Sequence, residues 1–129
     1  MRVLLDTHAL LWALAQPDLL SILARSILRD ASNGVLVSSA SAWEIATKRR
    51  IGRLRNAEPI VAGYAAHLRM LRAEDLPITA EHALLAGSFQ GAHRDPFDRM
   101  LAAQAMVEGV PLLTNDRAFE SFPELKTIW

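Results

Sequence analysis

The fold of this chain follows from one stretch close to its N-terminus, which reads Arg2-Val3-Leu4-Leu5-Asp6-Thr7. Three consecutive apolar residues are typical of a short strand that is buried on both faces, as in a parallel sheet. The run ends in a carboxylate and a hydroxyl, and ligands of open α/β sheets bind outside the carboxyl ends of the strands. Asp6 therefore has two interpretations from this stretch alone: it caps the helix that follows, or it belongs to a functional site.

The composition narrows the class of protein. With 129 residues, 51% of them hydrophobic and 22% charged, the chain is typical of an ordinary globular protein, and we expect residues 1–129 to form one domain. The 14 basic and 14 acidic residues cancel, so any surface that binds nucleic acid must be local. The absence of cysteine excludes disulfides and thiolate metal sites. We expect a cytoplasmic protein without a membrane segment, because no apolar run approaches the roughly 20 residues of a membrane span.

The periodicity of apolar residues predicts helices that alternate with short strands. Helices are expected at about residues 8–15, 20–31, 39–48, 59–72, 79–87 and 96–108. Strands are expected at residues 3–5, 35–37, 76–78, 110–114 and 126–129, of which 76–78 and 126–129 would lie at edges of the sheet. This order predicts an α/β fold, a three-layer α/β/α sandwich with a short, mostly parallel central sheet.

Acidic residues follow the strands or open the helices of this predicted arrangement. Asp6 and Asp116 end strands, whereas Glu44, Asp95 and Asp98 lie in the first turns of helices that follow a strand or its loop. Parallel strands bring such positions to one edge of the sheet, so four or five carboxylates are expected to converge there. Two carboxylates about 4 Å apart repel by roughly 4 kcal/mol at an effective dielectric constant near 20, so such a cluster needs a cation.

The chemistry of these residues indicates which cation. Oxygen ligands without cysteine favour a hard ion, Mg²⁺ or Mn²⁺, over zinc. Such an ion activates water and holds a phosphate, which is the metal-assisted route to phosphodiester hydrolysis. Each acid also has a purely structural interpretation. Ser41 and Glu44 have the spacing of a capping box, and Asp95 before a proline has the chemistry of an N-cap, with Asp98 at the favoured third position.

A basic segment follows the predicted helix 39–48. Its members are five cationic residues within eight positions: Lys48, Arg49, Arg50, Arg53 and Arg55. The helix macrodipole favours cations at a helix C-terminus but does not require so many. The segment is either a local surface that contacts RNA phosphates or a plain solvated face.

Four segments of the chain, in order, resemble the motifs of a known family. They are Leu4-Leu5-Asp6-Thr7, Ser41-Ala42-Trp43-Glu44-Ile45, Asp98-Arg99-Met100-Leu101-Ala102-Ala103-Gln104-Ala105 and Leu113-Thr114-Asn115-Asp116. Together they resemble PIN-domain ribonucleases, and among these the VapC-like toxins of type II toxin–antitoxin systems. The resemblance implies a PIN-like nuclease domain, Mg²⁺-dependent endoribonuclease activity on an RNA substrate, and toxicity when unrestrained. It also implies a homodimer and inhibition by a small cognate antitoxin.

The resemblance also implies roles for the four acids that occupy the family's acidic positions. Asp6 and Asp98 would be the principal metal ligands. Glu44 and Asp116 would be direct or water-mediated ligands, one of which orients the attacking water. These four residues are the predicted catalytic set.

Neighbouring polar residues receive smaller roles by the same resemblance. Thr7 and Thr114 match small hydroxyl positions that would hold a carboxylate or water, and Asn115 is a further candidate beside them. Asp95 departs from the widest family pattern, and we interpret it as an N-cap with some electrostatic influence on the site. His8 is also not general to the family, and we interpret it as a packed neighbour rather than a general base.

Other functions remain open on the sequence. A haloacid-dehalogenase-like phosphatase would need a second aspartate two residues after the first, where this chain has His8. A receiver-like signalling domain would need an acidic pair at the first strand, which is absent. A catalytically inactive PIN-like module that binds RNA or a protein is disfavoured, because an inactive site has no reason to keep four mutually repelling acids.

Overall fold

The centre of the molecule is a parallel sheet with the strand order β3-β2-β1-β4-β5. The computed structural model describes residues 1–91 and 93–129, and within these ranges the sheet has five strands. The strands are β1 (Arg2–Leu5), β2 (Gly34–Ser38), β3 (Ala73–Leu76), β4 (Leu112–Leu113) and β5 (Thr127–Ile128). Since all neighbouring pairs are parallel, the carboxyl ends of the strands lie along one edge, as the sequence predicted.

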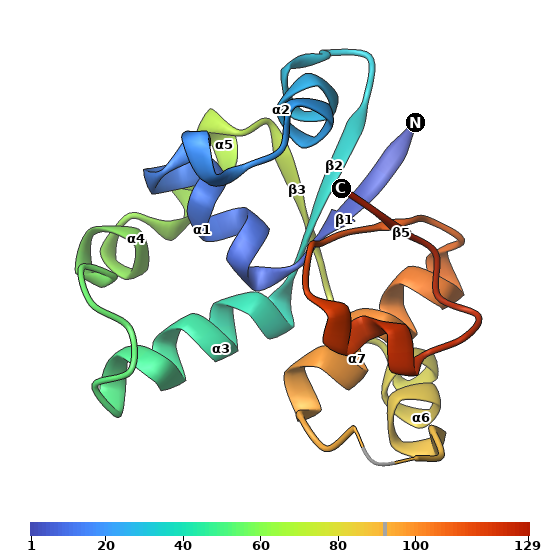
Figure 1. Cartoon of the computed structure of the whole chain (residues 1–129). Helices are drawn as coiled ribbons and strands as arrows, with labels where there is room; N and C mark the ends of the chain where they lie inside the picture. The colour runs from blue at the N-terminus through green and yellow to red at the C-terminus, as the bar shows by residue number, and fades with distance from the viewer. Residues whose placement is uncertain (92) are drawn as a thin grey trace.

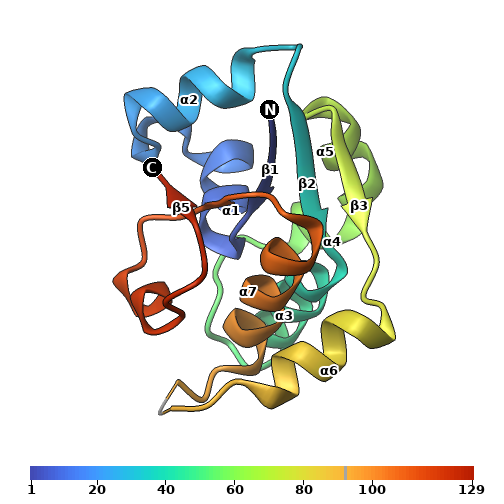
Figure 2. The ribbon, with the colours of Figure 1, turned by 90° about the vertical axis from the view of Figure 1, so that its right-hand side faces the viewer.

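Helices cover both faces of this sheet. On one face lie α1 (Thr7–Ala15), α2 (Ile22–Arg29), α4 (Glu58–Ala62) and α5 (Tyr64–Met70), and on the other lie α6 (Ala80–Ser88) and α7 (Pro96–Glu108) (Figure 1). Figure 2 looks onto the sheet from the side of α6 and α7. The helix α3 (Ser39–Arg50) runs away from the end of β2 and packs against both α1 and α7. Short 3-10 helices occupy Pro17–Leu19 and Arg117–Ser121.

Alternation along the strands divides the core into two parts. Val3 and Leu5 of β1 pack into the cluster that contains residues of α1, α2, α3 and α5. Leu4 packs into the opposite cluster, with Leu101 and Ala105 of α7. Successive side chains of a strand point to opposite faces, so a wholly apolar run is what a strand with helices on both sides requires. The predicted three-layer α/β/α sandwich is confirmed.

Two predicted elements were wrong in detail. The single helix expected over residues 59–72 is two helices, α4 and α5, which are separated at Gly63. The edge strand expected at 76–78 is β3, which ends at Leu76. Pro77 has no N–H to donate to a neighbouring strand. The expected position of this strand was too late in the sequence because its middle residues, Glu74 and Asp75, are exposed and acidic and do not form an apolar run.

The order of the strands creates a switch point between β1 and β4. From β1 the chain proceeds outward through β2 to β3, and it then returns to the other side of β1 to form β4. Ligands of open α/β sheets bind at such a point, outside the carboxyl ends of the strands. Asp6 and Thr114, which directly follow β1 and β4, therefore lie where the topology favours a site. Across residues 1–91 and 93–129, no helix has the length and apolar character needed to cross a membrane.

Candidate active site

The switch point holds a chain of hydrogen bonds between the ends of β1 and β4. Asp6 is buried and caps α1, where its Oδ1 accepts the backbone N–H of Ala9 at 2.6 Å. Its Oδ2 accepts a hydrogen bond from the buried hydroxyl of Thr114. The same hydroxyl oxygen accepts the backbone N–H of Asp116 at 3.0 Å. Asp6 is thus a helix cap, as one of its two interpretations from sequence held, and it is also part of a buried polar network.

The electrostatic environment of Asp6 leaves its negative charge undercompensated. Burial raises the pKa of this carboxyl above its ordinary value. The hydrogen bonds from Thr114 and Ala9 and the nearby His8 oppose this effect, whereas the charge of Asp116 adds to it. The pKa stays raised because burial outweighs the two hydrogen bonds.

Glu44 lies on α3 as a second buried acid. Only 3% of the residue is exposed, and its carboxylate forms an ion pair with Lys48, one turn further along the helix. The capping-box interpretation of Ser41 and Glu44 was wrong. Ser38 caps α3 by accepting the N–H of Ala40, so Glu44 lies well inside the helix. The hydroxyl of Ser41 is instead 3.0 Å from that of Thr7, a contact that links the first turns of α1 and α3.

Asp98 lies in the first turn of α7. The N-cap role predicted for Asp95 is confirmed, since its Oδ1 accepts the N–H groups of Phe97 and Asp98 at 2.9 and 3.2 Å. Burial, together with the charges of Asp95 and Glu44, raises the pKa of Asp98 to about 6. The Nε2 of His93 lies 3.0 Å from Oδ2 of Asp98 and opposes the rise. Asp95 is therefore both the N-cap of α7 and one of the charges that raise the pKa of Asp98.

The loop before α7 is held by Arg99, a residue that the sequence analysis left without a role. Its guanidinium donates to three backbone carbonyl oxygens: those of Ala86 at 3.0 Å, Phe89 at 2.6 Å and His93 at 2.9 Å. A guanidinium presents its donors in a fixed fork, so these contacts fix the backbone of Ala86, Phe89 and His93 relative to α7. Arg99 therefore sets where His93 meets the carboxylate of Asp98.

Gln104 is a second residue whose role the sequence did not reveal. It is fully buried on α7, and its Oε1 accepts a hydrogen bond from Ser38 at the end of β2. Its amide nitrogen lies 3.4 and 3.3 Å from the carbonyl oxygens of Leu76 and Pro77. Gln104 thus ties α7 to the ends of β2 and β3. The sequence did carry a signal, because Gln104 stands among apolar neighbours in its helix. An amide at such a buried position needs hydrogen-bond partners.

The remaining predicted residues are placed as follows. Thr7 is buried and contacts Ser41, so its hydroxyl serves the packing of α3 on α1. Asn115 is exposed after β4. His8 is exposed, with its ring centroid 5.9 Å from that of Trp12. His93 is the contact of the acids that the sequence analysis missed, since it lay in a segment interpreted only as a loop.

The basic segment divides into two groups. Lys48 and Arg49 already have acidic partners, Glu44 and Glu58 respectively. In contrast, Arg50, Arg53 and Arg55 are exposed at and beyond the end of α3. Arg49 is exposed too, but among the described residues only Arg50, Arg53 and Arg55 of this segment have no ion-pair partner.

The acids form two electrostatic groups at the carboxyl edge of the sheet. Asp116 influences the pKa of Asp6, and Glu44 influences that of Asp98. In the part of the chain that the structure describes, no three acidic, histidine or cysteine side chains are close enough together to hold one metal ion. Each carboxylate is turned toward a hydrogen-bond or ion-pair partner within the protein. The donor set itself consists of carboxylate oxygens, which are the ligands that Mg²⁺ and Mn²⁺ prefer.

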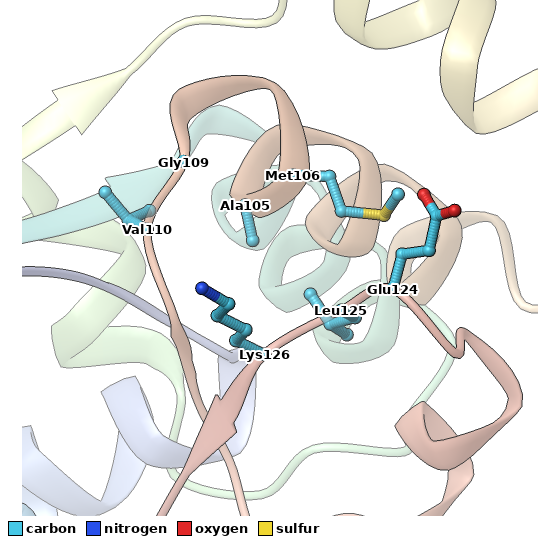
Figure 3. A pocket seen from close by; sticks show the side chains of 7 residues that line it. All are labelled: Ala105, Met106, Gly109, Val110, Glu124, Leu125 and Lys126. Carbon is cyan, nitrogen blue, oxygen red and sulfur yellow. The ribbon is translucent and has the colours of Figure 1, made fainter.

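A separate cavity lies at the other end of α7. It has a volume of about 280 Å³ and is lined by Ala105, Met106, Gly109, Val110, Glu124, Leu125 and Lys126 (Figure 3). Asp98 precedes Met106 by about two turns of helix, or roughly 12 Å along the axis. This cavity is therefore distinct from the group of acids. A smaller cavity of about 100 Å³ is lined in part by Thr114, Asn115 and Asp116, at the end of β4.

The fold and the acids at the switch point together define a class of protein. Residues 3–125 match the sequence model of the PIN domain, and the chain belongs to this family. It is similar to ribonuclease VapC22 of Mycobacterium tuberculosis, with 32% identity over 132 residues that cover 98% of each chain.

Solved structures show the same fold at lower identity. VapBC2 from Rickettsia felis, bound to a DNA fragment from its promoter, superimposes with a TM-score of 0.73 at 20% identity, covering 99% of this chain and 98% of the other. VapBC-1 from nontypeable Haemophilus influenzae gives a TM-score of 0.70 at 20% identity over 99% and 97% of the two chains. The expected PIN-like fold is confirmed.

Proposed function

We propose that this protein is a metal-dependent endoribonuclease and the toxin of a toxin–antitoxin pair. The observation that carries the proposal is the excess of negative charge around Asp98, whose pKa is raised to about 6 by burial and by Asp95 and Glu44. Perturbed acids in a group of like charges are a mark of functional sites. Membership of the PIN domain family and similarity to ribonuclease VapC22 support the same conclusion.

To hold a metal, Asp6 and Asp98 would have to turn from their present partners toward each other, with Glu44 and Asp116 as direct or water-mediated ligands. A bound Mg²⁺ supplies a more acidic water as the nucleophile and neutralises charge on the phosphate. The protein's own contribution is the placement of these acids. Thr114 orients Asp6, and the first turn of α7 orients Asp98.

Local contacts keep the remaining acids in place for this role. Lys48 forms an ion pair with Glu44, and His93 contacts Asp98. Both contacts lower the free-energy cost of keeping a carboxylate charged in a buried position. The exposed Arg50, Arg53 and Arg55 are suited to bind the phosphates of the RNA on either side of the cleaved bond.

The nuclease proposal is tested by removing one acid at a time. Asp6→Asn and Asp98→Asn should each reduce cleavage of single-stranded RNA by about 100-fold or more, because each removes a proposed ligand of the metal that would activate water and neutralise the phosphate. Both variants should keep the far-UV circular dichroism of the wild type. Glu124→Gln, which removes an exposed acid far from the group, is the matched control and should cleave normally. Full cleavage in EDTA, or by Asp98→Asn, would refute the proposal.

The partners are proposed on the same basis. We expect a homodimer and a small cognate antitoxin, since the fold matches that of VapBC proteins. An antitoxin would be encoded by a short reading frame next to this one. Expression of the wild type alone should arrest growth, and co-expression of that reading frame should relieve the arrest. Growth arrest by Asp98→Asn that equals the wild type would separate toxicity from cleavage and contradict the proposal.

A further inference from the structure

A large aromatic side chain lies in solvent on α3, the helix that carries Glu44. Trp43 on α3 precedes the buried Glu44, yet 57% of it is exposed. Tryptophan is highly buried on average, so an exposed one is more informative than an exposed leucine. Trp12 and Trp129, by comparison, are partly buried and contact each other edge-on.

Trp43 is held in place by an aromatic residue from a second helix. Its ring centroid lies 4.7 Å from that of Phe97, with an angle of 73° between the planes, which is the favoured edge-to-face geometry. Phe97 lies in the first turn of α7, where Asp95 accepts its N–H, and it directly precedes Asp98. Each aromatic residue is therefore the sequence neighbour of one acid. The pair bridges α3 and α7 beside Glu44 and Asp98.

The surface around Trp43 has the charge that a nucleic acid requires. Residues three, four and seven positions further along α3 share its side of the helix, and these are Ala46, Thr47 and Arg50. None of them is acidic, and Arg50 is exposed. Beyond the helix end, Arg53 and Arg55 are exposed as well. An exposed aromatic side chain followed by exposed arginines matches the alternation of bases and phosphates along a single strand of RNA.

We propose that Trp43, supported by Phe97, stacks on an unpaired base of the RNA substrate next to the cleaved phosphate. This inference rests on the proposed ribonuclease function and adds a residue that positions the substrate. Proteins recognise single-stranded RNA largely by stacking its bases on aromatic side chains. Stacking tolerates every base, so Trp43 would fix the position of the strand, while the acids act on the phosphate beside it.

The test measures RNA binding in EDTA, where cleavage is absent. The probe is a short single-stranded RNA that carries 2-aminopurine, a base whose fluorescence is quenched when it stacks. Trp43→Leu should weaken binding about 5- to 150-fold and remove the quenching, since base stacking on one aromatic residue has this magnitude. Trp43→Phe keeps an aromatic ring and should bind within about threefold of the wild type. Met70→Ala is the control, because it removes another exposed apolar side chain, on α5.

Each outcome decides the inference. Equal affinity and equal quenching for wild type and Trp43→Leu would overturn it, and normal cleavage by both with Mg²⁺ would leave the nuclease proposal intact. A wild type that binds RNA with stacking but does not cleave it with Mg²⁺ would refute the proposed function alone. A changed mass of Trp43→Leu in light scattering, with unchanged RNA affinity, would show a contact between copies and also overturn the inference. In cleavage assays, Trp43→Leu should raise KM more than it lowers kcat.

Discussion

Replacing Asp98 with asparagine should stabilise the folded protein at neutral pH while it abolishes cleavage. Burial, with the charges of Asp95 and Glu44, raises the pKa of Asp98 from 3.8 to about 6. A pKa shift of this size corresponds to about 3 kcal/mol of unfolding free energy. Because the Asp98 side chain is partly exposed, screening by solvent reduces this to roughly 2 kcal/mol. Asparagine has nearly the same shape, carries no charge and still offers an oxygen to His93.

The gain in stability should depend on pH with a defined sign. Because the pKa of Asp98 is higher in the folded state, the folded protein binds a proton where the unfolded chain does not, between about pH 4 and pH 6. The free energy of unfolding of the wild type therefore falls as the pH rises through this window. The difference between Asp98→Asn and the wild type should be near zero at about pH 4 and roughly 2 kcal/mol above about pH 6.

Urea unfolding in EDTA at several pH values measures this difference directly. At neutral pH we expect a higher unfolding midpoint for Asp98→Asn and a rise in Tm of roughly 5–8 °C. Glu124→Gln serves as the control for the loss of one negative charge from the exposed surface. Added Mg²⁺ should stabilise the wild type more than Asp98→Asn, because ligand binding stabilises only the state that binds. A variant that is less stable than the wild type at neutral pH, or a difference that does not change with pH, would refute the reasoning.

Three further substitutions test the contacts around the site and the core. Thr114→Val removes the hydroxyl that donates to Asp6 and should destabilise the protein by about 1–3 kcal/mol in urea unfolding, whereas Thr114→Ser should stay close to the wild type in stability and cleavage. Gln104→Leu leaves Ser38 and two carbonyl groups without their partner and should lower the unfolding free energy by a similar 1–3 kcal/mol; an unchanged urea midpoint would show that these contacts are weak. Tyr64→Phe should leave thermal stability unchanged or raise it by about 1 kcal/mol, because the buried Tyr64 hydroxyl has no hydrogen-bond partner within the described ranges, and a clear loss of Tm would contradict this.

Local patterns were sufficient to predict most of the framework. The apolar run before Asp6 predicted a strand with helices on both faces, and β1 packs into both parts of the core. Asp95 before a proline predicted the start of α7, and Gly109 predicted its end, where it has the left-handed φ of 64° that glycine adopts readily. These features depend on residues within a few positions of each other. Periodicity and capping chemistry therefore encode them directly.

The same local patterns could not predict the long-range hydrogen bonds around the site. Thr114 reaches Asp6 across 108 positions in sequence, and Ser38 reaches Gln104 across 66. Such contacts depend on the order of the strands and on how α7 packs across them, which only the assembled sheet determines.

The sequence by itself determined that acids would follow the strands and open the helices at one edge of a parallel sheet. Only the tertiary structure decided which acids from distant parts of the chain influence each other: Asp6 with Asp116 at the switch point, and Asp98 with Glu44. It also decided that Trp43 stays exposed and packs against Phe97. Trp43 directly precedes Glu44 in the sequence, and Phe97 directly precedes Asp98. The physical reason is that burial and charge–charge interactions act over distances in space, and only folding brings distant parts of the chain within those distances.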